Sequence, residues 1–292
     1  MYRRQFSKMI GAGALSSLIP SRSLWDMKKV GKIGIQLYTV RDAMAEDPIG
    51  TLKAIAAMGY DDVEIAGYDS GKYYGMAPKE FKKVLDDLGL TVKSGHTLTG
   101  VRDKNKTGTP MNQFERYAAD AATIGQDYIV LAYLDDNERE RAEQYRGTAE
   151  LLNKCGEISK KHGVKMAYHN HDFEFYELDG KIPYDMLLAE TDPDIVDMEL
   201  DLYWIKKAEK STMKYFENHA GRFALWHVKD MDNTEEQFFT EVGNGVIDFK
   251  EIFKCKKKSG MQHFYVEQDA CKNHQPIESV KISIDYLEQM RY

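Results

Sequence analysis

The sequence predicts a single (β/α)8 barrel, and three observations support this fold class. A short apolar strand, a polar loop and an amphipathic helix recur eight times after residue 28, in units of roughly thirty residues. Glycine follows five of the eight helices, where the chain turns back into a strand. Polar residues gather where the strands end. A doubly wound sheet is the alternative, but it usually has fewer units, and no GxGxxG follows the first strand.

The individual elements follow from hydrophobic spacing and from helix start and stop residues. The predicted strands span 33–38, 62–66, 91–96, 128–132, 164–169, 195–201, 223–228 and 263–267. The predicted helices span 48–58, 78–88, 112–124, 138–162, 184–190, 204–219, 249–259 and 277–290. No low-complexity linker separates these units, so residues 29–292 are expected to form one barrel domain.

Residues 1–28 are predicted to be an export signal and linker. Arg3, Arg4, Phe6 and Lys8 match the twin-arginine pattern RRxFxK, and an apolar run over 9–19 follows. An ordinary secretory signal that happens to contain two arginines is the alternative. The signal pattern predicts an exported, periplasmic protein. No second apolar run is long enough for a membrane helix, so no integral membrane segment is expected in the mature chain.

Composition narrows the class of function. The chain has 292 residues, of which 42% are hydrophobic and 30% charged, which describes a globular protein with a large core. Its net charge of −7 argues against a nucleic-acid partner, because such proteins present a basic surface. The three cysteines have no CxxC spacing, so neither a disulfide scaffold nor a zinc knuckle is indicated. The oligomeric state stays open.

The strand ends are the predicted location of the active site, because a (β/α)8 barrel carries its site on the loops after its strands. Strand five runs into the segment HNHDFE, and His169 and His171 share one face of it. Taken alone, this segment is equally well explained by two surface histidines that have ordinary hydrogen-bond partners and no functional role. Four metal-capable side chains end adjacent strands five to eight: His169, Asp201, His227 and Glu267. Mixed nitrogen and oxygen ligands of this kind suit one divalent ion, Mn, Zn, Co or Fe.

Several longer segments resemble the xylose-isomerase-like TIM-barrel superfamily, which includes sugar phosphate isomerases/epimerases and inosose dehydratases. The matching segments are GIQLYTVRD, GYDDVEIAGY, AYHNHDFEF, ELDLYW, LWHVKD, EVGNGVIDF and YVEQD. The resemblance implies Glu, Asp, His and Glu as metal ligands on strands five to eight. Asp201, His227 and Glu267 match this set, whereas His169 stands where epimerases of the family place a glutamate.

The departure at His169 removes the pair of glutamates with which such epimerases move a proton between two faces of a carbon. Glu267 alone is still a candidate base. His171 or Glu174 could supply the second proton-transfer group, or His169 could stay outside the metal site.

Other residues at strand ends receive weaker assignments. Lys229 is expected to hold a substrate oxygen or stabilise an enolate, with a solvated loop lysine as the alternative. His96 is expected to line the substrate pocket, and Glu64 to lie in the pocket or behind the ligands. Tyr38 and Trp204 could stack on a sugar, although most such aromatics belong to a core. Gly243, Asn244 and Gly245 are expected to form a structural loop.

The leading functional prediction is a metal-dependent isomerase or epimerase that removes the proton beside a carbonyl of a small carbohydrate. The alternative is a lyase or dehydratase that expels a β-hydroxyl or glycosidic oxygen from a keto-sugar or 3-keto-glycoside, which His169 favours. A periplasmic sugar-binding barrel without catalysis is a further alternative. The negative charge and export signal argue against an abasic-site endonuclease.

Overall fold

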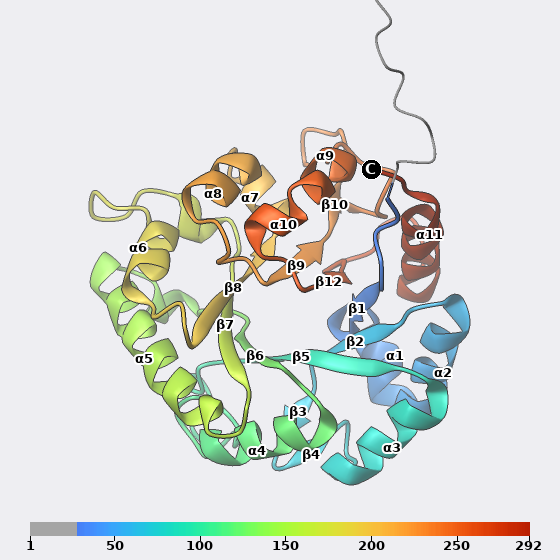
Figure 1. The fold of residues 1–292 in the computed structure, drawn as a ribbon, viewed down its shortest axis with the longest axis horizontal. Coiled ribbons are helices and arrows are strands. Elements are labelled where there is room, and N and C mark those ends of the chain that lie inside the picture. Colours follow the sequence, from blue (N-terminus) through green and yellow to red (C-terminus); the bar gives the residue numbers. More distant parts are fainter. Residues whose placement is uncertain (1–27) are drawn as a thin grey trace, which may run out of the picture.

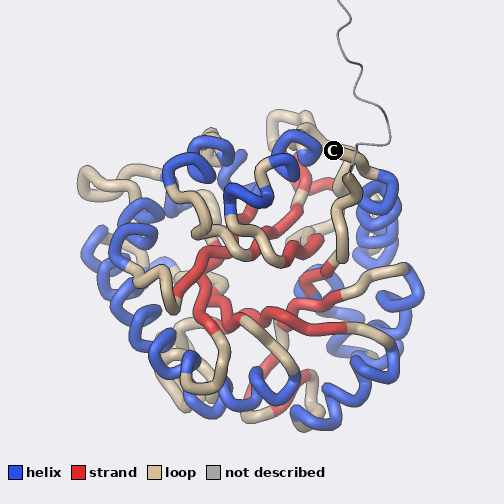
Figure 2. Tube along the Cα trace, in the orientation of Figure 1, coloured by secondary structure: helices blue, strands red, loops and turns tan. Residues whose placement is uncertain are grey.

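The computed structural model describes residues 28–292, and these form the predicted closed barrel (Figure 1). Eight parallel strands follow one another around the ring in chain order, and the last pairs with the first. Figure 2 shows these strands at the centre with the helices outside them. The strands are β1 Gly34–Gln36, β2 Asp62–Ile65, β5 Thr91–Thr97, β6 Tyr128–Leu131, β7 Lys165–His169, β8 Val196–Asp201, β9 Leu225–Val228 and β12 His263–Val266.

The outer layer consists of helices whose ends follow the sequence signals closely. Pro48 and Pro78 lie in the first turns of their helices, and Gly59 and Gly89 end them in the left-handed conformation that favours glycine. The helices are α1 Arg41–Glu46, α2 Pro48–Met58, α3 Pro78–Leu88, α4 Phe114–Ile124, α5 Ala142–Lys160, α6 Pro183–Glu190, α7 Leu202–Lys207, α8 Thr212–Asn218, α9 Phe249–Lys254, α10 Lys256–Ser259 and α11 Pro276–Gln289.

Two predicted helices are each divided in the structure. The helix expected over 204–219 is wrong as a single element, because Glu209 adopts a φ of 56° and Ser211 caps a new helix, α8. The Asp201 side chain caps the first part, α7, by accepting from the amides of Tyr203 and Trp204. The helix expected over 249–259 is likewise divided at Cys255 into α9 and α10.

Two short antiparallel hairpins rise from the loops beyond the strand ends. The first joins β3 Tyr68–Asp69 to β4 Lys72–Tyr73, after β2. The second joins β10 Asp230–Met231 to β11 Phe239–Thr240, after β9. Both lie on the side of the barrel where the strands end, so they add walls to the region of the predicted site.

The barrel interior has a largely apolar middle layer and a polar upper part. A small buried cluster inside the ring contains Tyr128, Val130, Ala167, Ala224, Leu225 and Tyr265. Alternation along each strand then places His169 above Ala167, His227 above Leu225 and Glu267 above Tyr265. A larger core fills the space between strands and helices.

The predicted export segment lies outside the described residues. At the edge of the described part, Lys28 and Tyr292 exchange backbone hydrogen bonds of 3.0 and 3.2 Å. Within residues 28–292, no helix combines the length and the hydropathy that a membrane span needs.

Candidate active site

The four predicted metal ligands lie together at the top of the barrel. One ligand atom from each of His169, Asp201, His227 and Glu267 lies within 4.8 Å of all the others, and all four side chains are buried. His169, Asp201 and His227 lie at or near the ends of β7, β8 and β9, and Glu267 directly follows β12. This donor set of two imidazoles and two carboxylates fits a divalent transition metal or zinc.

The orientation of His169 also fits a ligand. Its Nδ1 lies 3.1 Å from the Ala132 carbonyl, so the ring donates from Nδ1. The lone pair of Nε2 then faces Asp201, whose Oδ2 lies 3.3 Å away. A second hydrogen bond that fixes the tautomer in this way is typical of metal-binding histidines.

His227 is oriented from below by a fully buried carboxylate. Its Nε2 donates to Glu64 Oε2 over 2.7 Å, and Gln36 Nε2 donates to the same oxygen over 2.8 Å. Nδ1 is left facing Glu267 Oε2 at 2.8 Å. Glu64 was expected to bind substrate in the pocket or to lie behind the ligands; it does not line the cavity and is fully buried beside His227, which agrees with the second alternative.

Asp201 combines a structural and a ligand role. Its Oδ1 accepts the amides of Tyr203 and Trp204, both at 2.9 Å, while Oδ2 points into the cluster. Burial acts to raise the pKa of Asp201, but the charge of Lys229 and the neighbouring histidines outweigh it and hold that pKa well below its usual range. The carboxylate is therefore ionised and available to a cation.

Lys229 lies behind the cluster and not in the cavity. Its ammonium is fully buried, 3.0 Å from Asp201, 2.7 Å from Glu267 and 2.7 Å from Asp269. Burial acts to lower the pKa of Lys229, but these three carboxylates outweigh it and raise the pKa well above its usual value. The predicted contact of Lys229 with substrate is replaced by a role in positioning three carboxylates.

A second group of polar residues lies one layer deeper. His96 Nε2 lies 2.7 Å from Glu199 Oε2 and 3.5 Å from Glu64 Oε2. Burial is the largest effect on the pKa of Glu199 and, together with the charge of Glu64, raises it well above its usual value. Glu199 thus supports His96, which lines the cavity as predicted.

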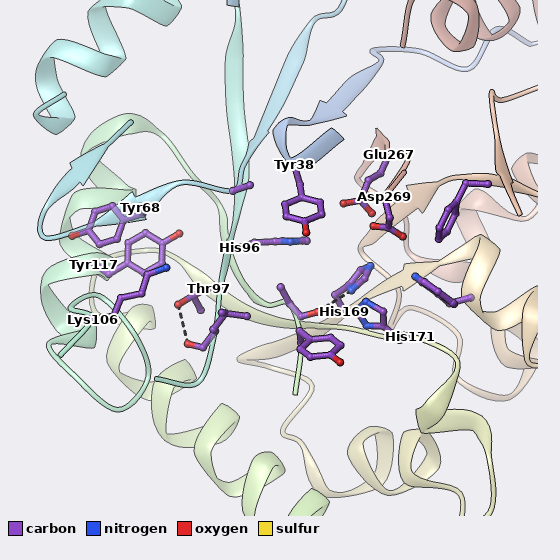
Figure 3. A pocket seen from close by; sticks show the side chains of 16 residues that line it. Tyr38, Tyr68, His96, Thr97, Lys106, Tyr117, His169, His171, Glu267 and Asp269 are labelled. Carbon is purple, nitrogen blue, oxygen red and sulfur yellow. Dashed lines mark hydrogen bonds between the residues drawn. The ribbon is translucent and has the colours of Figure 1, made fainter. Parts of the chain in front are cut away.

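The cavity above these residues has a volume of about 450 Å³ (Figure 3). Of the predicted residues, Tyr38, His96, His169, His171, Trp204 and Glu267 line it. Tyr38 is 44% exposed and forms part of the rim.

His171 and Trp204 line the cavity, and each also carries a buried polar atom without a protein partner in the described part of the chain. His171 Nδ1 and Trp204 Nε1 are both buried atoms with no hydrogen-bond partner among the described residues. Burial, followed by the charges of His169 and Lys229, lowers the pKa of His171 well below its usual value, so the ring is neutral. Glu174 holds the loop by accepting the His171 amide over 2.8 Å, and does not line the cavity.

Comparison with known proteins identifies the family. A family model described as xylose isomerase-like TIM barrel matches residues 52–290. The chain belongs to this family. An inosose dehydratase of Bacillus licheniformis is 28% identical over 260 residues, covering 78% of this chain and 86% of the relative.

Solved structures agree with the family assignment. A sugar phosphate isomerase/epimerase from Parabacteroides distasonis is 30% identical, with a TM-score of 0.75 over 88% of this chain and 93% of its own. The IOLI protein with a bound zinc atom, at 15% identity and a TM-score of 0.69, covers 87% of this chain and 95% of its own, and shares the fold. These xylose isomerase-like relatives are enzymes by name, a dehydratase and an isomerase/epimerase.

Some site residues of this xylose isomerase-like chain were missed by sequence reasoning. Asp269 lines the cavity, and it shares strand parity with Glu267, which was a usable signal. Tyr133 and Phe239 also line it, as do Tyr68 and Lys106. These four come from loops and hairpins, whose direction cannot be read from strand alternation.

Proposed function

We propose that this protein is a divalent-metal-dependent lyase that removes the proton beside a carbonyl of a small carbohydrate and expels an oxygen from the next carbon. One observation carries the proposal. The two carboxylates that line the cavity, Glu267 and Asp269, follow the same strand, β12, whereas the β7 side offers the imidazoles of His169 and His171. Carboxylates on only one side of the cavity suit a reaction in which the substrate loses a proton that does not return to the opposite face of the carbon.

The metal site of this proposal consists of His169, Asp201, His227 and Glu267. Their donor types, their mutual distances and the hydrogen bonds that fix both imidazoles support it. A bound divalent ion would supply Lewis acidity, which polarises the carbonyl and acidifies the neighbouring C–H bond.

We assign the base to Asp269 and the ligand role to Glu267. Glu267 Oε2 is held by Lys229 and lies 2.8 Å from His227 Nδ1, and although burial acts to raise the pKa of Glu267, the charge of Lys229 and the contact with His227 lower it well below its usual range. Asp269 lines the cavity, and burial raises its pKa despite the contact with Lys229. Asp269 is therefore the better proton acceptor of the two.

The remaining groups bind and orient the substrate. His171 and Trp204 line the cavity and offer aromatic rings that suit stacking on a sugar. His96, fixed by Glu199, presents a further ring on the cavity floor. Lys229 forms ion pairs with Glu267, Asp269 and Asp201 and so fixes the positions of these three carboxylates relative to one another.

The test is incubation of metal-loaded protein with a 3-keto-glucoside and an inosose in D₂O, followed by NMR. We expect an unsaturated ketone together with released alcohol or water. Asp269→Asn should keep its metal and lose most turnover, whereas Glu267→Gln should lose metal. Full turnover by Asp269→Asn would return the base role to Glu267.

Epimerisation is the second candidate, because the relative from P. distasonis at 30% identity is named a sugar phosphate isomerase/epimerase. In the same experiment it would give deuterium at the carbon beside the carbonyl with the carbon skeleton and all substituents retained. Tight binding of sugars without any exchange would support a non-catalytic binding barrel.

We also propose export in folded form, on the basis of Arg3 and Arg4 with Phe6, Lys8 and the apolar run over 9–19. Changing Arg3 and Arg4 together to Lys should leave the protein in the cytoplasm. Fractionation that finds the same periplasmic yield for both proteins would rule out the twin-arginine route.

A further inference from the structure

The cavity is longer than the group of metal-ligating residues and has two chemically different ends. Figure 3 shows Glu267, Asp269, His169 and His171 at one end, and Tyr68, Thr97, Lys106 and Tyr117 at the other. His96 and Tyr38 lie between them in this view. The first end carries the proposed chemistry, whereas the second, here called the distal subsite, is defined by Tyr68, Thr97, Leu98, Lys106 and Tyr117.

The distal subsite is framed by two stacked tyrosines that are themselves almost fully buried, Tyr68 at 6% and Tyr117 at 0% exposure. The Tyr68 ring stacks on Tyr117 with centroids 4.1 Å apart, and the Tyr68 hydroxyl donates to Asp120 over 2.7 Å. A Cβ on Gly108 would lie 2.1 Å from the Tyr68 ring, so the 98–112 loop packs directly on this tyrosine. Leu98, 39% exposed, adds an apolar side chain from the same loop.

The distal subsite also continues outward. A second depression of about 370 Å³, lined by hairpin β3–β4 and the preceding loop, shares Tyr68 and Lys106 with the main cavity. No carboxylate among residues 28–292 forms an ion pair with Lys106. A ligand group bound in the distal subsite can therefore extend toward the surface and contact the unpaired Lys106 ammonium.

We propose that the distal subsite binds an aglycone, an apolar or aromatic body that bears a hydrogen-bond acceptor and is linked through oxygen to the keto-sugar. This inference rests on the proposed lyase function and deepens it. The polar end of the cavity suits one sugar ring, and a free keto-sugar or keto-polyol would leave the aromatic end filled only by water. The leaving group is accordingly an alcohol or phenol and not hydroxide.

The elimination balances without a further reactant. In a 3-keto-glycoside, the C2–H bond breaks and its proton goes to Asp269. The electron pair forms the C1–C2 double bond, and the C1–O bond to the aglycone breaks. The released oxygen takes up one proton, so the products are an unsaturated keto-sugar and the free alcohol.

The first test compares turnover of methyl and phenyl 3-keto-β-glucosides with that of an inosose by the metal-loaded protein. Phenol is the better leaving group in any protein, so the informative quantity is the change of the phenyl-over-methyl ratio of kcat/KM between the native protein and Leu98→Trp, which fills the distal subsite. We expect the native ratio to be larger by roughly tenfold or more, because only the native subsite buries the ring. Equal ratios in the native protein and Leu98→Trp would overturn the aglycone subsite while leaving the lyase proposal intact.

The second test uses Lys106 and a matched control on the same loop. Lys106→Met should reduce the ratio of kcat/KM for a 4-carboxyphenyl over a phenyl 3-keto-β-glucoside by roughly tenfold. Lys104→Met, which removes an exposed charge that lines neither cavity, should leave that ratio unchanged. Equal ratios in the two variants would remove Lys106 from the proposal.

A binding measurement tests the distal subsite independently of the proposed lyase reaction. Calorimetry with the non-reacting phenyl and methyl β-glucosides should show tighter binding of the phenyl compound, and Leu98→Trp should remove the difference. If no 3-keto-glucoside is turned over but this preference is found, the subsite stands and the lyase proposal fails. If neither turnover nor binding prefers the phenyl compound, the subsite is wrong.

Discussion

His169 is the residue that separates this site from the epimerase pattern its sequence resembles. Its ring is tied to the Ala132 carbonyl through Nδ1, which leaves Nε2 beside Asp201. A neutral imidazole bound through Nε2 cannot accept a substrate proton, and it adds no negative charge to the site. A less negative ligand set makes a stronger Lewis acid, which favours departure of a leaving group.

His169→Glu should retain metal, slow elimination by roughly tenfold, equivalent to about 1.4 kcal/mol of barrier, and permit slow exchange of the proton beside the carbonyl. The added negative charge weakens Lewis acidity while restoring a second carboxylate. NMR in D₂O measures both reactions. His169→Gln offers a neutral oxygen ligand as a control, and an equal loss in both variants would show that charge is not the cause.

Glu64 is the nearest acceptor of His227 Nε2, so its removal should appear in metal affinity. Glu64→Ala removes the acceptor 2.7 Å from His227 Nε2, leaves only Glu199 Oε2 at 3.3 Å, and should weaken metal binding by roughly 10–100-fold. Glu64→Gln retains an acceptor oxygen and should lose much less. Competition with a chromophoric chelator measures the affinities, and an unchanged affinity in Glu64→Ala would refute the positioning role.

Among the elements, the loop after hairpin β10–β11 is built on one buried carboxylate. Asp230 accepts the amides of Gly243 and Gly245 at 2.9 and 3.1 Å and that of Ile247 at 3.1 Å. A Cβ on Gly245 would lie 2.2 Å from the Met231 carbonyl oxygen. The glycines therefore serve close backbone packing, in agreement with the prediction of a structural loop.

Gly245→Ala should reduce the free energy of unfolding by roughly 3 kcal/mol, because the backbone oxygen cannot move away cheaply. Gly147→Ala is the matched control: Gly147 lies exposed in α5 with open space around it, and alanine should stabilise that helix by about 1 kcal/mol. Urea unfolding measures both. A destabilisation by Gly147→Ala, or none by Gly245→Ala, would contradict this account.

Strand parity made much of this fold and site predictable from sequence. The positions of His169, Asp201, His227 and Glu267 followed from alternation and from strand ends, which are local properties. The depth of each side chain inside the barrel was not predictable. Alternation indicates that Glu64 points into the ring, but it does not indicate that Glu64 lies beneath His227. The division of the sixth helix also escaped prediction, since the turn depends on a left-handed Glu209 and not on glycine or proline.

At the scale of the whole molecule, the lower end of the barrel holds a buried acid. Asp62 accepts from the amide of Val63 and from Thr91, and lies near Tyr265 and His263. Burial is the main cause that raises the pKa of Asp62 from 3.8 to about 7. The folded protein therefore binds this proton more tightly than the unfolded chain does.

This proton linkage gives stability a pH dependence of defined sign. The contribution of Asp62 is fully present below about pH 4 and is lost as pH rises through about 7, by at most about 4 kcal/mol. Asp62→Asn is neutral at every pH and should lose this slope. Thermal unfolding of both proteins from pH 4 to 8 measures the difference, and parallel curves would exclude Asp62 as its source.

The pairing of β12 with β1, here called the seam, is the last to form and therefore determines when the site is complete. On a growing chain the strands that supply His169, Asp201 and His227 emerge first, but Glu267 arrives only with the last strand, whose pairing with β1 closes the ring. The complete ligand set therefore exists only in a finished barrel. The free energy of ion binding then resists opening of this one seam, so amide exchange at Ile35 and loss of metal should proceed as a single event.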